Sequence, residues 1–98
     1  MNKPVVFAAV FLSFVGYQAA SQTASAGECQ DLWYERNAIF NNNGYCFRSN
    51  LGKSLFDNSD CYTRNARLTR GEQNRVARIK RRERQLGCSV NTRRRSLY

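Results

Sequence analysis

Four cysteines are the residues of this sequence best placed to do covalent chemistry. Successive cysteines lie 17, 15 and 27 positions apart, at Cys29, Cys46, Cys61 and Cys88. A zinc site of four thiolates usually supplies its ligands as close CxxC pairs, a spacing that none of these cysteines has. An even number of cysteines in a short exported chain is typical of structural disulfides. We therefore expect two disulfides and no metal site.

The carboxylates of the first half offer little catalytic chemistry. The sequence contains no histidine and no Gly-rich phosphate loop, so the usual general-base and nucleophile arrangements are missing. Asp31 and Glu35 could meet the carboxyl separation of about 5 to 9.5 Å that glycosidases need, but so short a chain hardly builds a cleft around them. We expect them to form a structural polar cluster with Arg36 and Asn37, held together by the guanidinium group. The prediction is a protein that is not an enzyme and uses no cofactor.

Basic side chains are concentrated in the second half of the chain. From Arg64 onward twelve basic residues face two acidic ones, whereas between residues 27 and 63 the acidic residues outnumber the basic ones by five to three. A basic surface attracts phosphate-rich or acidic polymers. The side chains predicted to bind such an anionic partner are Arg75, Arg78, Arg81, Arg82, Arg93, Arg94 and Arg95. The alternative interpretation is a solvated basic face that serves only solubility.

Residues 1–26 have the pattern of a secretory signal peptide. An apolar run over 5–15 follows a single lysine, and an "ASA" triplet of small residues ends at Ala26. The run is short compared with the roughly 20 residues that a helix needs to cross a bilayer. We predict cleavage after Ala26, with Ala20 as the second choice, and a mature protein in the periplasm or outside the cell with no transmembrane anchor. A retained interfacial anchor is the alternative.

Apolar residues at helical spacing predict two helices in the first half of the mature chain. The first covers about 28–44 and ends in the asparagine–glycine run 41–44, because Asn is a poor helix former and Gly readily takes the left-handed conformation. A short second helix begins at Ser49 or Asn50, either of which can cap it. Its apolar residues are Leu51, Leu55 and Phe56.

A third helix begins near Thr69, whose spacing to Glu72 is that of a capping box, and ends at Gly87. Its narrow apolar stripe consists of Val76, Ile79 and Leu86. Residues 27–90 are therefore predicted to form one helical domain. The sequence 91–98 has no apolar period and is predicted to be a basic disordered tail.

The predicted helices restrict which cysteines can pair. A helix roughly 20 Å long separates Cys29 from Cys46, whereas a disulfide needs α carbons within about 7 Å, and the third helix separates Cys61 from Cys88 in the same way. Antiparallel packing of the first and third helices would pair Cys29 with Cys88 and Cys46 with Cys61. Parallel packing would pair Cys29 with Cys61 and Cys46 with Cys88. We predict the antiparallel arrangement, and thus an all-α domain of three helices stapled by Cys29–Cys88 and Cys46–Cys61.

Residues 36–40 form an arginine-asparagine-x-isoleucine-aromatic segment, and residues 44–47 form a glycine-aromatic-x-phenylalanine segment. Both segments resemble those of the YARHG domain family. Leu51 and Phe56 fall where the family has a leucine and a later aromatic residue, so that the resemblance covers about 29–88. It implies a bacterial extracellular module, and the cysteines resemble those of a disulfide-bearing branch of alpha-proteobacterial secreted proteins. The resemblance implies no particular activity.

The sequence departs from the family at the motif that gives the family its name. After an aromatic residue the family has alanine, arginine, histidine and glycine, whereas this chain has Phe40 followed by Asn41, Asn42, Asn43 and Gly44. The arginine and the histidine are absent, so any role they have in other members does not transfer to this chain.

Export and charge together indicate a function in binding. We expect a non-catalytic module that associates with anionic components of the cell envelope through its Arg-rich helix, and export argues against nucleic acid as the partner. The alternative is a module for a protein partner, such as an inhibitor or an envelope assembly factor, that uses exposed aromatic residues near Trp33 and Tyr45.

Overall fold

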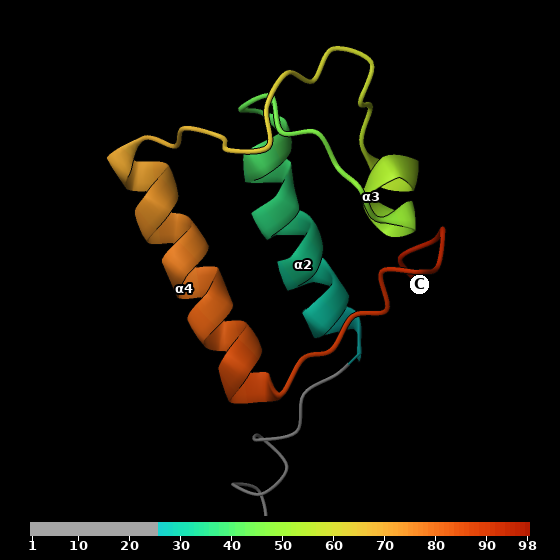
Figure 1. Cartoon of the computed structure of the whole chain (residues 1–98). Coiled ribbons are helices and arrows are strands. Elements are labelled where there is room, and N and C mark those ends of the chain that lie inside the picture. The colour runs from blue at the N-terminus through green and yellow to red at the C-terminus, as the bar shows by residue number, and fades with distance from the viewer. Residues whose placement is uncertain (1–25) are drawn as a thin grey trace, which may run out of the picture.

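The computed structural model describes residues 26–98 of the chain. This part contains three helices, α2 (Ala26–Asn41), α3 (Asn50–Leu55) and α4 (Arg70–Leu86), and no strand beyond an isolated bridge between Tyr45 and Thr63. The predicted all-α fold is therefore confirmed (Figure 1). The predicted signal peptide lies outside the described residues except for its last residue, with which α2 begins.

The asparagine–glycine run ends α2 as predicted. The helix stops at Asn41, and Gly44 takes the left-handed conformation with φ +82°. This positive φ favours glycine, and the exposed ring of Tyr62 lies against Gly44, where a Cβ atom would displace it. The chain then folds back, because the Tyr45 N–H donates to the Phe40 carbonyl at 3.1 Å and the two rings pack edge to face.

Local capping determines where α3 and α4 begin and end. The Ser49 hydroxyl accepts a hydrogen bond from the Gly52 N–H at the start of α3. At the start of α4, Thr69 and Glu72 form both bonds of the predicted capping box. Gly87 closes α4 in the left-handed conformation, with φ +67°.

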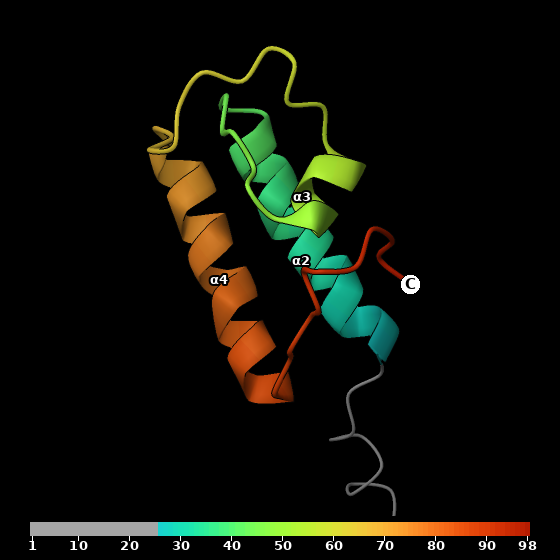
Figure 2. The same cartoon turned by 45° about the vertical axis from the view of Figure 1, so that its right-hand side comes forward.

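Helices α2 and α4 lie side by side and run in opposite directions (Figures 1 and 2). Ile39 of α2 and Val76 and Ile79 of α4 are buried between them, so two residues of the predicted stripe are core residues. Leu86, at the end of the stripe, is only partly buried. The apolar face of α4 is therefore used up in packing against α2, and its remaining faces are basic.

A second core lies between α2 and α3. It consists of Trp33, Phe47, Leu51 and Phe56, with Leu51 fully buried. The rings of Phe47 and Phe56 are stacked with their centroids 4.8 Å apart. Because α3 has only six residues, most of its stability must come from this aromatic packing rather than from helix propensity.

Both predicted disulfides are present. Cys29 is bonded to Cys88 with the α carbons 5.4 Å apart, and Cys46 to Cys61 with the α carbons 5.0 Å apart. The first bond joins the start of α2 to the end of α4, which is the connectivity that antiparallel helices require. All four cysteines of the sequence are thus in disulfides, and none is a free thiol.

The structure corrects the prediction that residues 91–98 form a disordered tail. The Thr92 carbonyl accepts from the Leu51 N–H at 3.0 Å, and Leu97 packs against the core between α2 and α3. The Tyr98 hydroxyl donates to the Asp31 carboxylate. The tail can order without a helical period because the disulfide at Cys88 holds its first residues beside α2, which reduces the entropy cost of docking.

Candidate functional site

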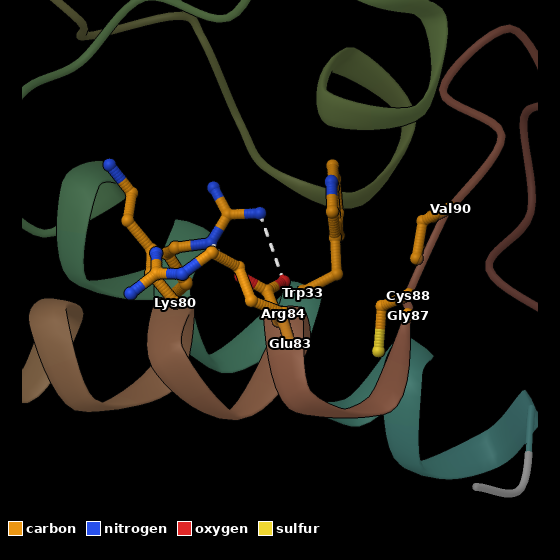
Figure 3. A pocket seen from close by; sticks show the side chains of 8 residues that line it. Trp33, Lys80, Glu83, Arg84, Gly87, Cys88 and Val90 are labelled. Carbon is orange, nitrogen blue, oxygen red and sulfur yellow. Dashed lines mark hydrogen bonds and ion pairs between the residues drawn. The ribbon is translucent and has the colours of Figure 1, made fainter.

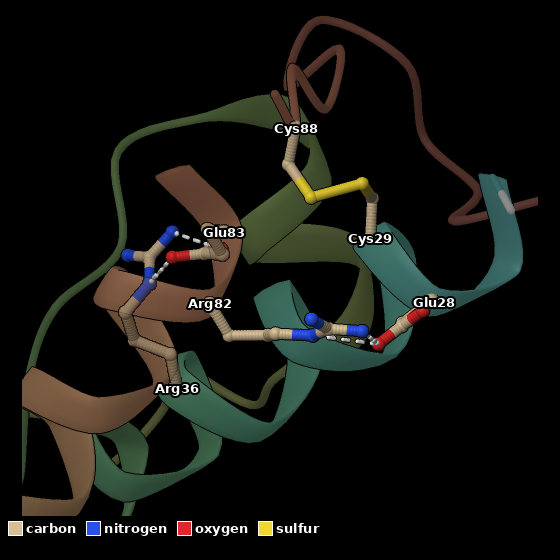
Figure 4. The surroundings of a disulfide bond; sticks show 6 residues. All are labelled: Glu28, Cys29, Arg36, Arg82, Glu83 and Cys88. Atoms are coloured by element: carbon tan, nitrogen blue, oxygen red, sulfur yellow. Dashed lines mark hydrogen bonds and ion pairs between the residues drawn. A yellow bond between two sulfur atoms is a disulfide. The ribbon is translucent and has the colours of Figure 1, made fainter. Parts of the chain in front are cut away.

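Two of the arginines predicted to bind anions are paired with α2. Arg75 Nη2 lies 2.7 Å from Glu35 Oε2, and Arg82 Nη2 lies 2.9 Å from Glu28 Oε2 (Figure 4). All four side chains are more than a third exposed, so each pair contributes little to stability. The pairs do, however, neutralise part of the charge along the edge of α4 that borders α2.

The outer surface of α4 keeps its full charge. Arg78 and Arg81 are exposed, and within residues 26–98 neither side chain forms an ion pair or a hydrogen bond. Their positions place them opposite the buried stripe of Val76 and Ile79, since residues of a helix return to the same face only after three or four positions. We call Arg78 and Arg81 the outer face.

The predicted cluster of tail arginines lies elsewhere. The tail runs from the end of α4 across α2 to α3, on the side of α2 away from α4 (Figure 1). The Arg93 carbonyl accepts a hydrogen bond from the side chain of Asn50 in α3, and Arg94 Nη2 donates to the Tyr98 carbonyl at 3.2 Å. The tail arginines 93–95 and the outer face are therefore two separate basic surfaces. The sequence alone could not show that the two surfaces are separate, because their separation depends on the direction that the chain takes after Gly87.

The four residues of the predicted polar cluster of α2 do not pair with one another. Arg36 instead donates two hydrogen bonds across to Glu83 of α4, at 2.9 and 3.0 Å. Asn37 donates to the Trp33 carbonyl within α2. Glu35 binds Arg75, as described above, and Asp31 accepts from the tail. Partners on neighbouring segments replace the expected contacts within the helix, because α2 is packed on more than one side.

Asp31 and Glu35 are thus held by different parts of the molecule. The Asp31 carboxylate accepts the hydrogen bond of Tyr98, which raises the pKa of that phenol, with desolvation and the negative charge of Asp31 acting in the same direction.

Within residues 26–98 no group of three or more cysteine or acidic side chains could hold a metal ion.

A groove that the sequence did not indicate lies between α2 and α4 (Figure 3). It has a volume of about 400 Å³ and is lined by Trp33, Arg36, Lys80, Glu83, Arg84, Gly87, Cys88 and Val90. A smaller hollow of about 180 Å³ shares Arg36 and Lys80 with it and reaches Asn37, Phe40 and Tyr45. We call the two together the α2–α4 groove. The spacing of Lys80 and Arg84, one helical turn apart, was its only signal in the sequence.

Comparison with known proteins shows to which protein family the chain belongs. The family model of the YARHG domain matches residues 10–84, which is most of the sequence. The chain belongs to the YARHG domain family. The match begins within the predicted signal peptide and ends within α4, and no curated protein and no solved structure matches the chain.

In this YARHG domain the residue in place of the motif histidine has a structural role. The Asn43 side chain donates to the Ile39 carbonyl at 2.7 Å and to Glu72 Oε2 at 3.2 Å. The pKa of Glu72 is lowered, first by the hydrogen bond from the Thr69 N–H and then by the bond from Asn43. The asparagine run therefore both ends α2 and fastens that end to the start of α4.

Membership in the YARHG family and the two disulfides are consistent with the same cellular location. Two disulfides and a YARHG domain fit a periplasmic or extracellular location, where disulfides persist. No helix between Ala26 and Tyr98 is long and apolar enough to span a membrane.

Proposed function

We propose that this YARHG domain is an exported, non-catalytic module that associates with anionic components of the cell envelope through the outer face of α4. The observation that supports this most directly is that Arg78 and Arg81 are exposed and, in the described part of the chain, have no acidic partner. Arginines that do not already serve an ion pair can bind phosphate or carboxylate groups with two parallel hydrogen bonds.

The charge distribution favours attraction to an extended anionic surface. Most of the net charge of +9 comes from the second half of the chain, and α4 carries much of it on one exposed helix. Such a field attracts acidic polymers and anionic lipid headgroups, and the attraction weakens as salt screens it. The structure narrows the contact set that we expect, because Arg75 and Arg82 already bind carboxylates of α2 whereas the outer face does not.

The test measures binding of the disulfide-bonded protein to vesicles of mixed phosphatidylcholine and phosphatidylglycerol, and to a purified envelope fraction, across a salt series. The variant with Arg78→Gln and Arg81→Gln should lose roughly 30-fold in affinity for anionic vesicles at low salt, at about 1 kcal/mol per arginine. The matched control is the variant with Arg93→Gln and Arg95→Gln, which removes the same charge from the tail and should lose less. Association that is independent of salt and unchanged in the outer-face variant would contradict the proposal.

A second candidate function is binding of a protein partner through exposed aromatic residues. The expected residues Trp33 and Tyr45 are buried and partly buried, but Tyr62 is 78% exposed and Tyr34 is 43% exposed. Aromatic side chains of this kind are common anchors of protein interfaces. Binding to such a partner should survive high salt and weaken in Tyr62→Ala, whereas binding through the outer face should show the opposite behaviour.

A further inference from the structure

The α2–α4 groove contains charges that the packing of the domain does not use. Of its cationic groups, Arg36 is half-buried and fully engaged by Glu83, with which it makes two hydrogen bonds. Lys80 and Arg84 are exposed, and within residues 26–98 neither side chain forms an ion pair or a hydrogen bond. Glu83 is neutralised by Arg36, so the groove presents two free positive charges on one side.

The other side of the groove is apolar. Trp33 and Val90 line this side. In Figure 3 Lys80 lies at the left of the groove, Glu83, Arg84 and Trp33 lie in the middle, and Val90 lies at the right. A ligand in the groove therefore meets two free cations on one side and an apolar wall on the other.

We propose that the α2–α4 groove binds a monosaccharide that carries one anionic group, with that group between Lys80 and Arg84 and the sugar ring against Trp33 and Val90. The larger hollow of the groove, which contains Lys80, Arg84, Trp33 and Val90, has a volume of about 400 Å³ and suits a small molecule rather than a polymer segment. A sugar ring fits a lining that mixes polar and apolar side chains, whereas an acyl chain would leave the charged residues of the groove without partners. The anion is a carboxylate or a phosphate, since an ammonium and a guanidinium group bind either.

This inference goes beyond the proposed association with the envelope, because it uses other residues of α4. The outer face consists of Arg78 and Arg81, whereas the groove uses Lys80 and Arg84 on the flank that borders Trp33. Each set can be changed without the other, so either proposal can fail alone.

The single tryptophan of the sequence provides a direct reporter of the groove. The experiment follows the indole N–H signal of Trp33 by NMR while the exported, disulfide-bonded protein is titrated with glucuronic acid or with glucose 6-phosphate. Glucose and inorganic phosphate, each at the same ionic strength, are the control ligands. We expect a saturable shift with at least one acidic sugar, at concentrations where neither control shifts the signal, and the two acidic sugars distinguish a carboxylate from a phosphate.

Two variants of equal charge locate the binding. Lys80→Gln with Arg84→Gln should weaken binding by about 100-fold or more, because the variant loses two charged hydrogen bonds and each is worth about tenfold or more. Arg78→Gln with Arg81→Gln should leave sugar binding unchanged. All four side chains are exposed, and a well-dispersed spectrum confirms that each variant is folded. No saturable shift with either acidic sugar, an equal shift with phosphate alone, or an equal loss in both variants would overturn the proposal.

Discussion

Removal of the disulfide between Cys29 and Cys88 should destabilise the domain more than removal of the disulfide between Cys46 and Cys61. The first bond joins residues 59 positions apart and the second joins residues 15 positions apart. In the chain-entropy model these loops correspond to about 4 and about 3 kcal/mol of stability. A difference of about 1 kcal/mol is thus expected from loop length alone.

The structure adds a further reason for this order. The bond at Cys88 also positions the tail, whose residues Val90 and Leu97 pack against the core between α2 and α3. Without that bond the tail has a longer free segment to order, and part of its contact with the core should be lost. The bond between Cys46 and Cys61 instead closes a short loop whose ends are already joined by backbone hydrogen bonds. The Gly44 carbonyl accepts from the Tyr62 and Thr63 N–H groups, and the Cys46 N–H donates to the Thr63 carbonyl.

The assay compares two double variants, Cys29→Ala with Cys88→Ala and Cys46→Ala with Cys61→Ala, by urea unfolding at 25 °C. Circular dichroism measures the helices, and the fluorescence of Trp33 measures the second core. A core of this size contributes only about 3 to 5 kcal/mol, so the first variant should unfold at a clearly lower urea concentration than the second, and the fully reduced protein, which lacks both bonds, should not fold. An equal or larger cost for the second variant, or cooperative unfolding of the fully reduced protein, would refute this reasoning.

Three further predictions concern the contacts that connect the segments. The pKa of Glu72 is lowered in the folded state, so the ionised carboxylate stabilises the fold above its ordinary pKa of 4.5, and this stabilisation is lost as the pH falls through the lower folded-state pKa. The difference in melting temperature between the wild type and Glu72→Gln should therefore shrink below pH 4.5. A difference that stays constant with pH would contradict this prediction. Leu97→Ala should lower the free energy of unfolding by about 1 kcal/mol in urea titrations, whereas a tail without contacts would give no change. Arg36→Gln should lower the free energy of unfolding by about 2 kcal/mol, because the side chains of Arg36 and Glu83 are only 22% and 13% exposed. The matched variant Arg75→Gln, which breaks an exposed pair, should lower it by less than about 0.5 kcal/mol. Equal losses in the same urea titrations would show that burial does not strengthen the pair of Arg36 with Glu83.

The sequence was sufficient for features that depend on neighbouring residues. The capping box at Thr69 and the left-handed glycine that ends α4 are patterns of three or four residues, and the structure shows both. The sequence also restricted the disulfide connectivity. Rigid helices between the cysteines left only two pairings, one for antiparallel and one for parallel packing of the first and third helices. The caps could be predicted because the physics behind them is local. Helix length reduced the disulfide pairings to two, and the pairing present is the one that requires antiparallel helices.

Other features were decided only when distant segments met. The ordered tail, the bidentate pair of Arg36 with Glu83 and the α2–α4 groove all join residues far apart in the sequence. Nothing in the pattern of residues 91–98 predicts docking, because Leu97 gains a core to pack against only after Cys88 is fixed beside α2. By itself the sequence determined the helices, their ends and the restriction of the disulfides to two pairings, since neighbouring residues and stiff helices specify these. The antiparallel packing of α2 and α4 then decided between the two pairings. The tertiary structure alone decided which arginines are paired and which remain free to bind a ligand, because the pairing of a charged side chain depends on what packs against it.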